Sequence, residues 1–198
     1  MDFNHIISRA KNIILSPATE WEVIKTEAKP SSDILLNYAV PFVLLVGVCK
    51  IVGSLLFHMS YFSLTSAILA AIIAIIVPLG TLYISAWIIN ELAGSFGSQK
   101  NFGAAFRLTA YAFTASYVAS AAAALLPIIG ISTILMLCGL YSLYILYLGF
   151  TPMMSTPEDK KAGYFVVSLL IIIVAMIILQ TILTLILIGG GAGMSMMR

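Results

Sequence analysis

The sequence predicts an all-α membrane protein, a bundle of five transmembrane helices preceded by an amphipathic cytoplasmic helical segment. The first observation is composition: 61% of the 198 residues are hydrophobic and 9% are charged, whereas a soluble domain is about 45–50% apolar and about 25% charged. The second is arrangement, because the apolar residues form five blocks near the roughly 20 residues that a helix needs to cross a bilayer. The third is a helical repeat of apolar residues in the polar N-terminal segment.

This composition also excludes several classes of protein. At a mean hydropathy of +1.08 the chain has too little polar surface for a soluble enzyme, a disordered regulator or a disulfide-stapled secreted domain. The net charge of +2 is small and the basic residues are dispersed, so we expect no nucleic-acid partner. The two cysteines, Cys49 and Cys138, fall inside predicted spans and are interpreted as small packing residues.

Residues 1–33 form the predicted cytoplasmic segment, which begins with an amphipathic helix. Its apolar residues recur at helical spacing on one face, and they are Phe3, Ile6, Ile7, Ala10, Ile13 and Ile14. The opposite face is polar and carries Arg9 and Lys11. Such a helix either lies in the plane of the lipid headgroups or packs on the cytoplasmic ends of the spans, and both can hold together.

A second short helix follows within the same segment. Ser16-Pro17 reads as a helix cap with proline in the first position, and the helix is predicted to reach about Glu27. Trp21 lies on its apolar face. We predict Trp21 at the membrane interface, with its ring buried and its N–H in water.

The transmembrane domain is predicted over residues 34–188. Its five spans are expected at about 34–57, 67–89, 104–126, 128–150 and 164–188. In the third span, the small residues 119–124 allow a neighbouring helix to approach closely. Residues 189–198 are predicted to form a flexible outer tail, because the run Gly189–Gly191 favours the end of a helix.

The positive charges predict the orientation, since lysine and arginine near span ends stay on the cytoplasmic side. With five spans and a cytoplasmic N-terminus, six such residues lie inside, namely Lys25, Lys29, Lys100, Arg107, Lys160 and Lys161. Only Arg198 then lies outside. We therefore predict a cytoplasmic N-terminus and an outer C-terminus.

Polar residues inside the spans are the candidates for function, because ionisable groups in hydrocarbon are costly. Lys50 either extends its amine to the outer interface or lines a cavity. Glu91 and Arg107 lie near the inner interface, either paired or independent. Pro78 predicts a kink in the second span. Gln180 and its neighbour one turn on, Thr184, are expected to face other helices rather than lipid.

A transport path would need these polar groups to converge. The residues that could line it are Lys50, Pro78, Tyr111, Thr114, Tyr141, Tyr144 and Gln180. Aromatic stripes such as the tyrosines of the fourth span are more often packing than a cofactor site. No hydrolase or metalloprotease motif is present, and His5 and His58 fall on opposite sides of the membrane. We therefore predict no enzyme activity, no metal and no cofactor.

Several stretches in order resemble the Yip family of five-span membrane proteins, especially its bacterial members. They are Ser16-Pro17-Ala18-Thr19-Glu20-Trp21 with Glu27, Gly94-Ser95-Phe96-Gly97 before Phe102 and Arg107, Ala110-Tyr111-Ala112-Phe113-Thr114, Leu126-Pro127-Ile128-Ile129-Gly130, and Tyr141-Ser142-Leu143-Tyr144 through Leu148-Gly149. The resemblance covers nearly the whole chain. Where the family often has proline this chain has Ala115, which predicts a straighter third helix.

The resemblance implies five spans, a cytoplasmic N-terminus and, for a bacterial member, the inner membrane. Eukaryotic relatives act in vesicle traffic between endoplasmic reticulum and Golgi and bind prenylated Rab-type GTPases. GTPase binding is not carried over, because the corresponding cytoplasmic motifs are not visible in this chain.

Two functions are expected from these observations. The first is a non-enzymatic membrane protein that organises membrane partners or lipids through its helices and cytoplasmic segment. Its partners would be membrane lipids, proteins on the cytoplasmic face, or a second copy of the chain. The alternative is a small transporter or channel with a polar path through the bundle.

Overall fold

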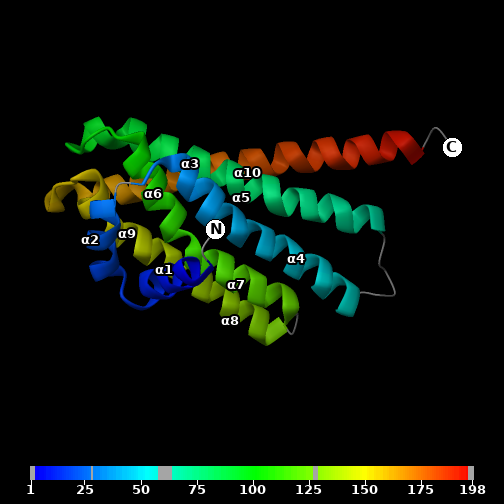
Figure 1. Cartoon of the computed structure of the whole chain (residues 1–198). Helices are drawn as coiled ribbons and strands as arrows, with labels where there is room; N and C mark the ends of the chain where they lie inside the picture. The colour runs from blue at the N-terminus through cyan, green and yellow to red at the C-terminus, as the bar shows by residue number, and fades with distance from the viewer. Residues whose placement is uncertain (1–2, 28, 58–63, 127–128, 196–198) are drawn as a thin grey trace.

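The computed structural model is an all-helical bundle (Figure 1). It describes residues 3–27, 29–57, 64–126 and 129–195, and within these ranges there is no strand. The elements are α1 (Phe3–Leu15), α2 (Pro17–Glu27), α3 (Ser31–Ile34), the π-helix η1 (Leu35–Ala39), α4 (Val40–Phe57), α5 (Leu64–Leu92), the 3₁₀ helix η3 (Ala93–Phe96), α6 (Phe102–Ala112), α7 (Thr114–Leu125), α8 (Ile129–Gly139), α9 (Tyr141–Met154) and α10 (Glu158–Ser195).

Five stretches of helix are long and apolar enough to cross a membrane in the described part of the chain, which confirms the predicted fold class. They are Ser31–Phe57, Ile72–Phe96, Phe102–Leu125, Thr133–Met154 and Glu158–Leu185. The two short helices α1 and α2 precede them and form an N-terminal hairpin. The chain is therefore an integral membrane protein.

The first span begins with an irregular turn next to a proline. Pro41 has no N–H to donate to the carbonyl of Asn37, so the regular ladder cannot pass through it. The chain adopts the π-helix η1 immediately before it, in which the Val40 N–H donates to the Leu35 carbonyl five residues back. The wider turn is the local consequence of the missing donor.

The third and fourth spans are each interrupted, at Phe113 and at Leu140. The sequence predicts a straighter third helix because it has Ala115 instead of proline, but a turn interrupts that helix at Phe113. Ser116 explains the turn. Its backbone N–H donates to Ser142 Oγ at 2.8 Å, and its hydroxyl donates to the Gly139 carbonyl at 2.9 Å. These bonds tie the two interruptions together and replace hydrogen bonds within each helix.

The helix α6 lies at the centre of the bundle. Eight of its eleven residues are buried, and it contacts both α5 and α9. α4 packs beside α7 very closely, because a Cβ on Gly53 would lie 1.9 Å from the Ala124 carbonyl oxygen. Small residues thus permit the close approach that the run 119–124 predicts.

The helix α10 lies at the periphery and packs mainly along α5 (Figure 1). It continues through the run Gly189–Gly191 to Ser195, whereas the sequence predicts a helix end and a flexible tail at that run. Glycine lowers helix propensity by about 1 kcal/mol per residue relative to alanine, but it does not forbid the helical conformation.

Candidate functional site

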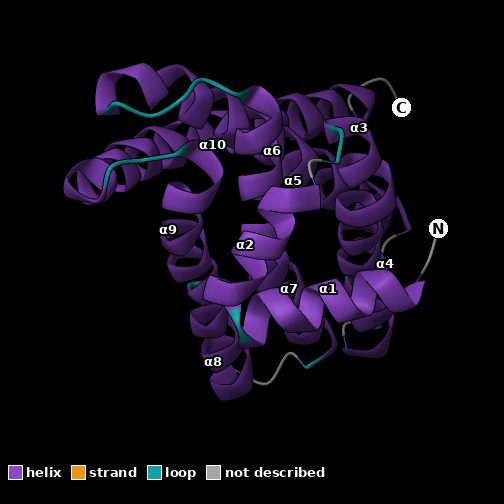
Figure 2. Ribbon diagram, turned by 60° about the vertical axis from the view of Figure 1, so that its left-hand side comes forward, coloured by secondary structure: helices purple, strands orange, loops and turns teal. Residues whose placement is uncertain are grey.

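The N-terminal hairpin packs on the side of the bundle, where α1 contacts α6 and α7 and α2 contacts α9 (Figure 2). Three apolar residues of α1, Ile6, Ala10 and Ile13, are buried in this contact. Two others on the predicted apolar face, Phe3 and Ile7, remain 65% and 64% exposed. Part of the apolar face of α1 therefore packs on the bundle, and the rest of that face is exposed.

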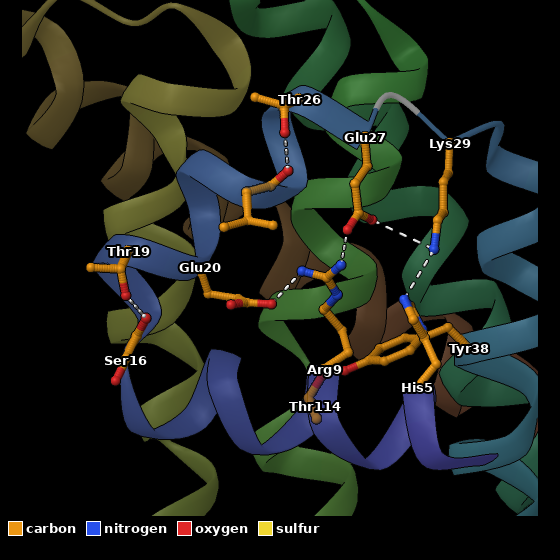
Figure 3. A network of polar contacts seen from close by, with 11 residues as sticks. His5, Arg9, Ser16, Thr19, Glu20, Thr26, Glu27, Lys29, Tyr38 and Thr114 are labelled. Carbon is orange, nitrogen blue, oxygen red and sulfur yellow. Dashed lines mark hydrogen bonds and ion pairs between the residues drawn. The ribbon is translucent and has the colours of Figure 1, made fainter. Parts of the chain in front are cut away.

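A buried charge network joins the two helices of the hairpin. Arg9, which the sequence places on the polar face of α1, is only 6% exposed. Its guanidinium forms ion pairs with the carboxylates of Glu20 and Glu27 on α2 (Figure 3). Because a buried ion needs a partner, these pairs fix the angle between α1 and α2.

The network extends outward from Glu27. Its second carboxylate oxygen lies 3.5 Å from the Lys29 amine, which in turn lies 3.4 Å from His5 Nε2 (Figure 3). Arg9 and Lys29 supply two positive charges against the two carboxylates of Glu20 and Glu27. The charges of these four side chains therefore balance.

The protonation of Arg9 reflects the same surroundings. Burial lowers the pKa of the Arg9 guanidinium, but the adjacent Glu27 and Glu20 carboxylates raise that pKa by more, so the net direction is upward. Arg9 therefore stays charged at any pH that a cell reaches.

Beneath Arg9 lies a cluster of hydroxyl groups from the first and third spans. The Arg9 guanidinium carbon is 5.9 Å from the centre of the Tyr111 ring, and this ring lies 4.5 Å from that of Tyr38. Thr114 Oγ1 donates to the Tyr111 carbonyl at 2.7 Å, and Tyr38 Oη lies 2.7 Å from Thr114 Oγ1. Since the threonine proton is used, Tyr38 is the donor in the second bond.

Trp21 anchors α2 to α9. Its ring is fully buried and its N–H donates to the Ile145 carbonyl at 3.0 Å. The sequence predicts this residue at the membrane interface with a wet N–H; in the structure the protein itself supplies both the apolar surroundings and the acceptor. Gly149 leaves room for the ring, since a Cβ there would lie 2.7 Å from Trp21 Cε2 and 2.4 Å from Leu108 Cδ1.

A polar cleft of about 250 Å³ opens between the two helices of the hairpin. It is lined by His5, Ser8, Arg9, Asn12, Glu20 and Val23. The donors and carboxylates could bind a small polar group, but the ion pairs already use the Arg9 and Glu20 charges. No cluster of three metal-ligating side chains occurs among the described residues.

Most of the remaining sequence-predicted residues lie apart from this network. Lys50 is exposed on α4, and Pro78 lies within α5. Gln180 is exposed on α10 and donates to Thr184 Oγ1 at 3.3 Å, whereas the sequence predicts that both face other helices. The structure brings Tyr111 and Thr114 of the proposed path together in this network, and Tyr141 and Tyr144 form a separate pair.

The tyrosines of the fourth span lie at the edge of the docked hairpin. Tyr141 and Tyr144 are 36% and 51% exposed, with ring centres 5.5 Å apart. The Tyr141 hydroxyl donates to the Ile14 carbonyl at 3.1 Å. Tyr141 therefore contacts α1, and neither tyrosine lines a described cleft with Lys50 or Gln180.

Glu91 and Arg107 do not pair with each other. Glu91 Oε2 accepts from the Lys100 amine at 2.7 Å, and Arg107 Nη1 donates to the Lys29 carbonyl at 3.0 Å. Of the two arrangements left open by the sequence, the structure has the independent one.

The residues at the centre of the network are Arg9, Glu20, Glu27 and Tyr38. The sequence did not predict them as site residues, although Glu20 and Glu27 belong to the stretches that resemble the Yip family. One signal was available: Glu20 and Glu27 are seven residues apart and so share a face of α2. The partner on α1 could not be read in the same way, because Arg9 lies on the face that an interfacial helix would give to water.

The chain is similar to one known protein domain family. The family model of the Yip1 domain matches residues 11–179, which extend from the second half of α1 into α10. Glu20 and Glu27 lie inside the match, whereas Arg9 precedes it. No curated protein and no solved structure matches the chain.

Proposed function

Because the chain belongs to the Yip1 domain family, we propose that it is a non-enzymatic membrane protein that organises lipids or protein partners at the cytoplasmic face of a bacterial inner membrane. The N-terminus is cytoplasmic and the C-terminus lies outside in this proposal. The family is associated with membrane traffic and is not known for enzymes. The docked hairpin is the observation that carries the proposal.

The hairpin is docked on the bundle and presents an apolar surface. Phe3, Ile7 and Leu15 are 65%, 64% and 68% exposed on the side of α1 that faces away from the bundle. Lys11 lies on the same exposed side. An apolar helix face with a basic residue suits the boundary between headgroups and acyl chains, where the lysine amine can reach the phosphates.

The position of α1 supports a role at the membrane surface. The bond from Tyr141 to the Ile14 carbonyl holds the helix against α9, beside the exposed ring of Tyr144. The C-terminal end of α1 thus lies beside the first turn of α9, where Tyr141 and Tyr144 are 36% and 51% exposed. Lipids or partners that bind there would touch both elements.

The other cytoplasmic segments support the proposed orientation. The loops after η3 and after α9 meet, since the Gln99 N–H donates to the Met154 carbonyl at 3.0 Å and Ser98 Oγ donates to Thr156 Oγ1 at 2.9 Å. Lys100 belongs to this end of the bundle. The lysines of both loops then lie on the side where positive charge is retained.

Affinity purification from native membranes, with lipids and proteins identified by mass spectrometry, tests the proposal. The informative variant is Ile7→Gln combined with Leu15→Gln, which changes only exposed side chains of α1. The control is Val23→Gln on α2, a position that is 46% exposed. We expect the double variant to lose lipids or partners that the wild type and the control retain. Identical recovery from all three proteins would contradict the proposal.

The orientation has its own test. Reporter tags at the two ends should show the N-terminus in the cytoplasm and the C-terminus outside. Both ends in one compartment would contradict the topology, whatever the result of the purification.

A further inference from the structure

The helix α10 has one covered face and one uncovered face. Tyr164, Ser168 and Ile172 are between 0% and 3% exposed, and the Tyr164 hydroxyl donates to the Ile89 carbonyl of α5. Within the described part of the chain, no other element buries the opposite face. Val166, Leu170 and Ile177 on that face are 50%, 59% and 61% exposed.

The uncovered face has the spacing of a coiled-coil seam. We define the α10 seam as the residues that follow one another at alternating steps of four and three, which are Val166, Leu170, Ile173, Ile177, Gln180 and Thr184. At about 100° per residue these positions lie within a stripe roughly 80° wide. A step pattern of this kind keeps the seam of one helix against a parallel partner over several turns.

Gln180 is the polar member of the seam that needs a partner. Residues 169–179 before it are all apolar, and residues 182, 183 and 185–188 after it are apolar too. Its one hydrogen bond to another described residue is the 3.3 Å bond to Thr184 on the same helix. The amide carbonyl and one amide N–H are left over, and hydrocarbon cannot satisfy them.

We propose that the α10 seam is the interface of a homodimer, in which the Gln180 amides of two copies bond to each other. Two copies inserted with one topology have parallel α10 helices, so a two-fold axis along the membrane normal brings each seam residue against its counterpart. An amide carries both a donor and an acceptor and is therefore complementary to itself. Gln180 and Thr184 are the two polar residues of the α10 seam, and pairing of polar residues within a mainly apolar seam also fixes the register of the two helices.

The surface beside Gln180 can receive a neighbour. A groove of about 320 Å³ lies between α5 and α10 and is lined by Val77, Met176, Ile177, Gln180 and Thr181. A side chain from the second copy that enters this groove would bury apolar surface next to the amide pair.

Cysteine crosslinking of the full chain in liposomes tests the proposal. In a background with Cys49→Ala and Cys138→Ala, the variants Ile177→Cys and Ile178→Cys are compared with a short bis-thiol reagent. The two positions are similarly exposed, at 61% and 54%, but Ile178 lies about 100° around the helix, off the seam. We expect crosslinked dimer from Ile177→Cys and little from Ile178→Cys.

The role of the amide is tested in the same background. Adding Gln180→Leu to Ile177→Cys should lower the crosslinked fraction at limiting protein density by about 3- to 30-fold, the range expected for a polar contact between membrane helices. Equal crosslinking at the two cysteine positions, or no effect of Gln180→Leu, would overturn the proposal. So would Ile177→Cys that remains monomeric at every protein density.

Discussion

Polar side chains have partners on other elements of the chain at the docked hairpin, whereas on the outward face of α10 they have none among the residues that the structure describes. At the hairpin, the charges of Arg9, Glu20 and Glu27 and the hydroxyls of Tyr38 and Thr114 find partners on several elements of the same chain. On α10, Gln180 reaches only its neighbour one turn away. The charges of the hairpin are thus paired within one chain, whereas in the proposed dimer the Gln180 amide is paired by a second copy.

The largest expected effect comes from removing the central charge of the hairpin. Arg9→Met leaves the buried Glu20 carboxylate without a counter-ion, and breaking a buried pair in this way costs about 3–5 kcal/mol. We expect the hairpin to detach and α2 to become sensitive to limited proteolysis. Lys11→Met, an exposed position on the same helix, is the control and should change nothing. Equal protease resistance of both variants would show that the charge network does not hold the hairpin.

A steric change at the base of the hairpin ranks second. Gly149→Ala places a Cβ 2.7 Å from Trp21 Cε2 and 2.4 Å from Leu108 Cδ1, and such overpacking costs about 1–3 kcal/mol. Thermal unfolding in detergent should show this loss of stability as a lower unfolding temperature for Gly149→Ala. Gly94→Ala is the matched control, because a Cβ there meets nothing within 4 Å. If both variants unfold at the same temperature, α2 is not packed against α9 as described.

A smaller effect is expected where the third and fourth spans are tied together. Ser116→Ala removes the hydroxyl that binds the Gly139 carbonyl at 2.9 Å, and polar contacts between membrane helices average about 0.6 kcal/mol. Ser120→Ala, one turn further along α7 and exposed, should be silent in the same unfolding measurement. An equally large loss of stability in Ser120→Ala would contradict the role of the Ser116 hydrogen bond.

The smallest effect concerns transport. Lys50 and Gln180 lie on different helices and are both exposed. Of the two clefts described above, one is lined by Gln180 without Lys50 or Tyr111, and the other by none of the three. Solute flux in proteoliposomes should therefore be unchanged by Lys50→Ala and by Gln180→Ala. A flux that falls in both variants would revive the channel hypothesis.

The sequence predicted the fold because the signals for a membrane span are strong and local. Five apolar blocks and the turn at Ser16-Pro17 are enough to locate the five spans and the two short N-terminal helices. The interruption at Phe113 could not be predicted in this way. It depends on Ser142, which is 26 residues from Ser116 and meets it only after the helices pack.

The site was harder to predict for the same reason. Arg9 and Trp21 read locally as an exposed charge and an interfacial ring, and each is buried by an element that the local pattern does not contain. The carbonyl that receives the Trp21 N–H is 124 residues away in the sequence. Periodicity identifies which residues share a helix face, but not which neighbour covers that face.

Fluorescence of Trp21 directly tests whether the N-terminal hairpin is part of the folded bundle. The chain has two tryptophans, so Trp87→Phe leaves Trp21 as the only one. Its fluorescence in liposomes should be quenched neither by iodide in the aqueous phase nor by brominated acyl chains in the bilayer. Quenching by iodide would mean that the Trp21 ring is exposed to water, and quenching by brominated lipid would mean that the ring inserts among lipids instead of packing on α9. Either result would contradict the docked hairpin.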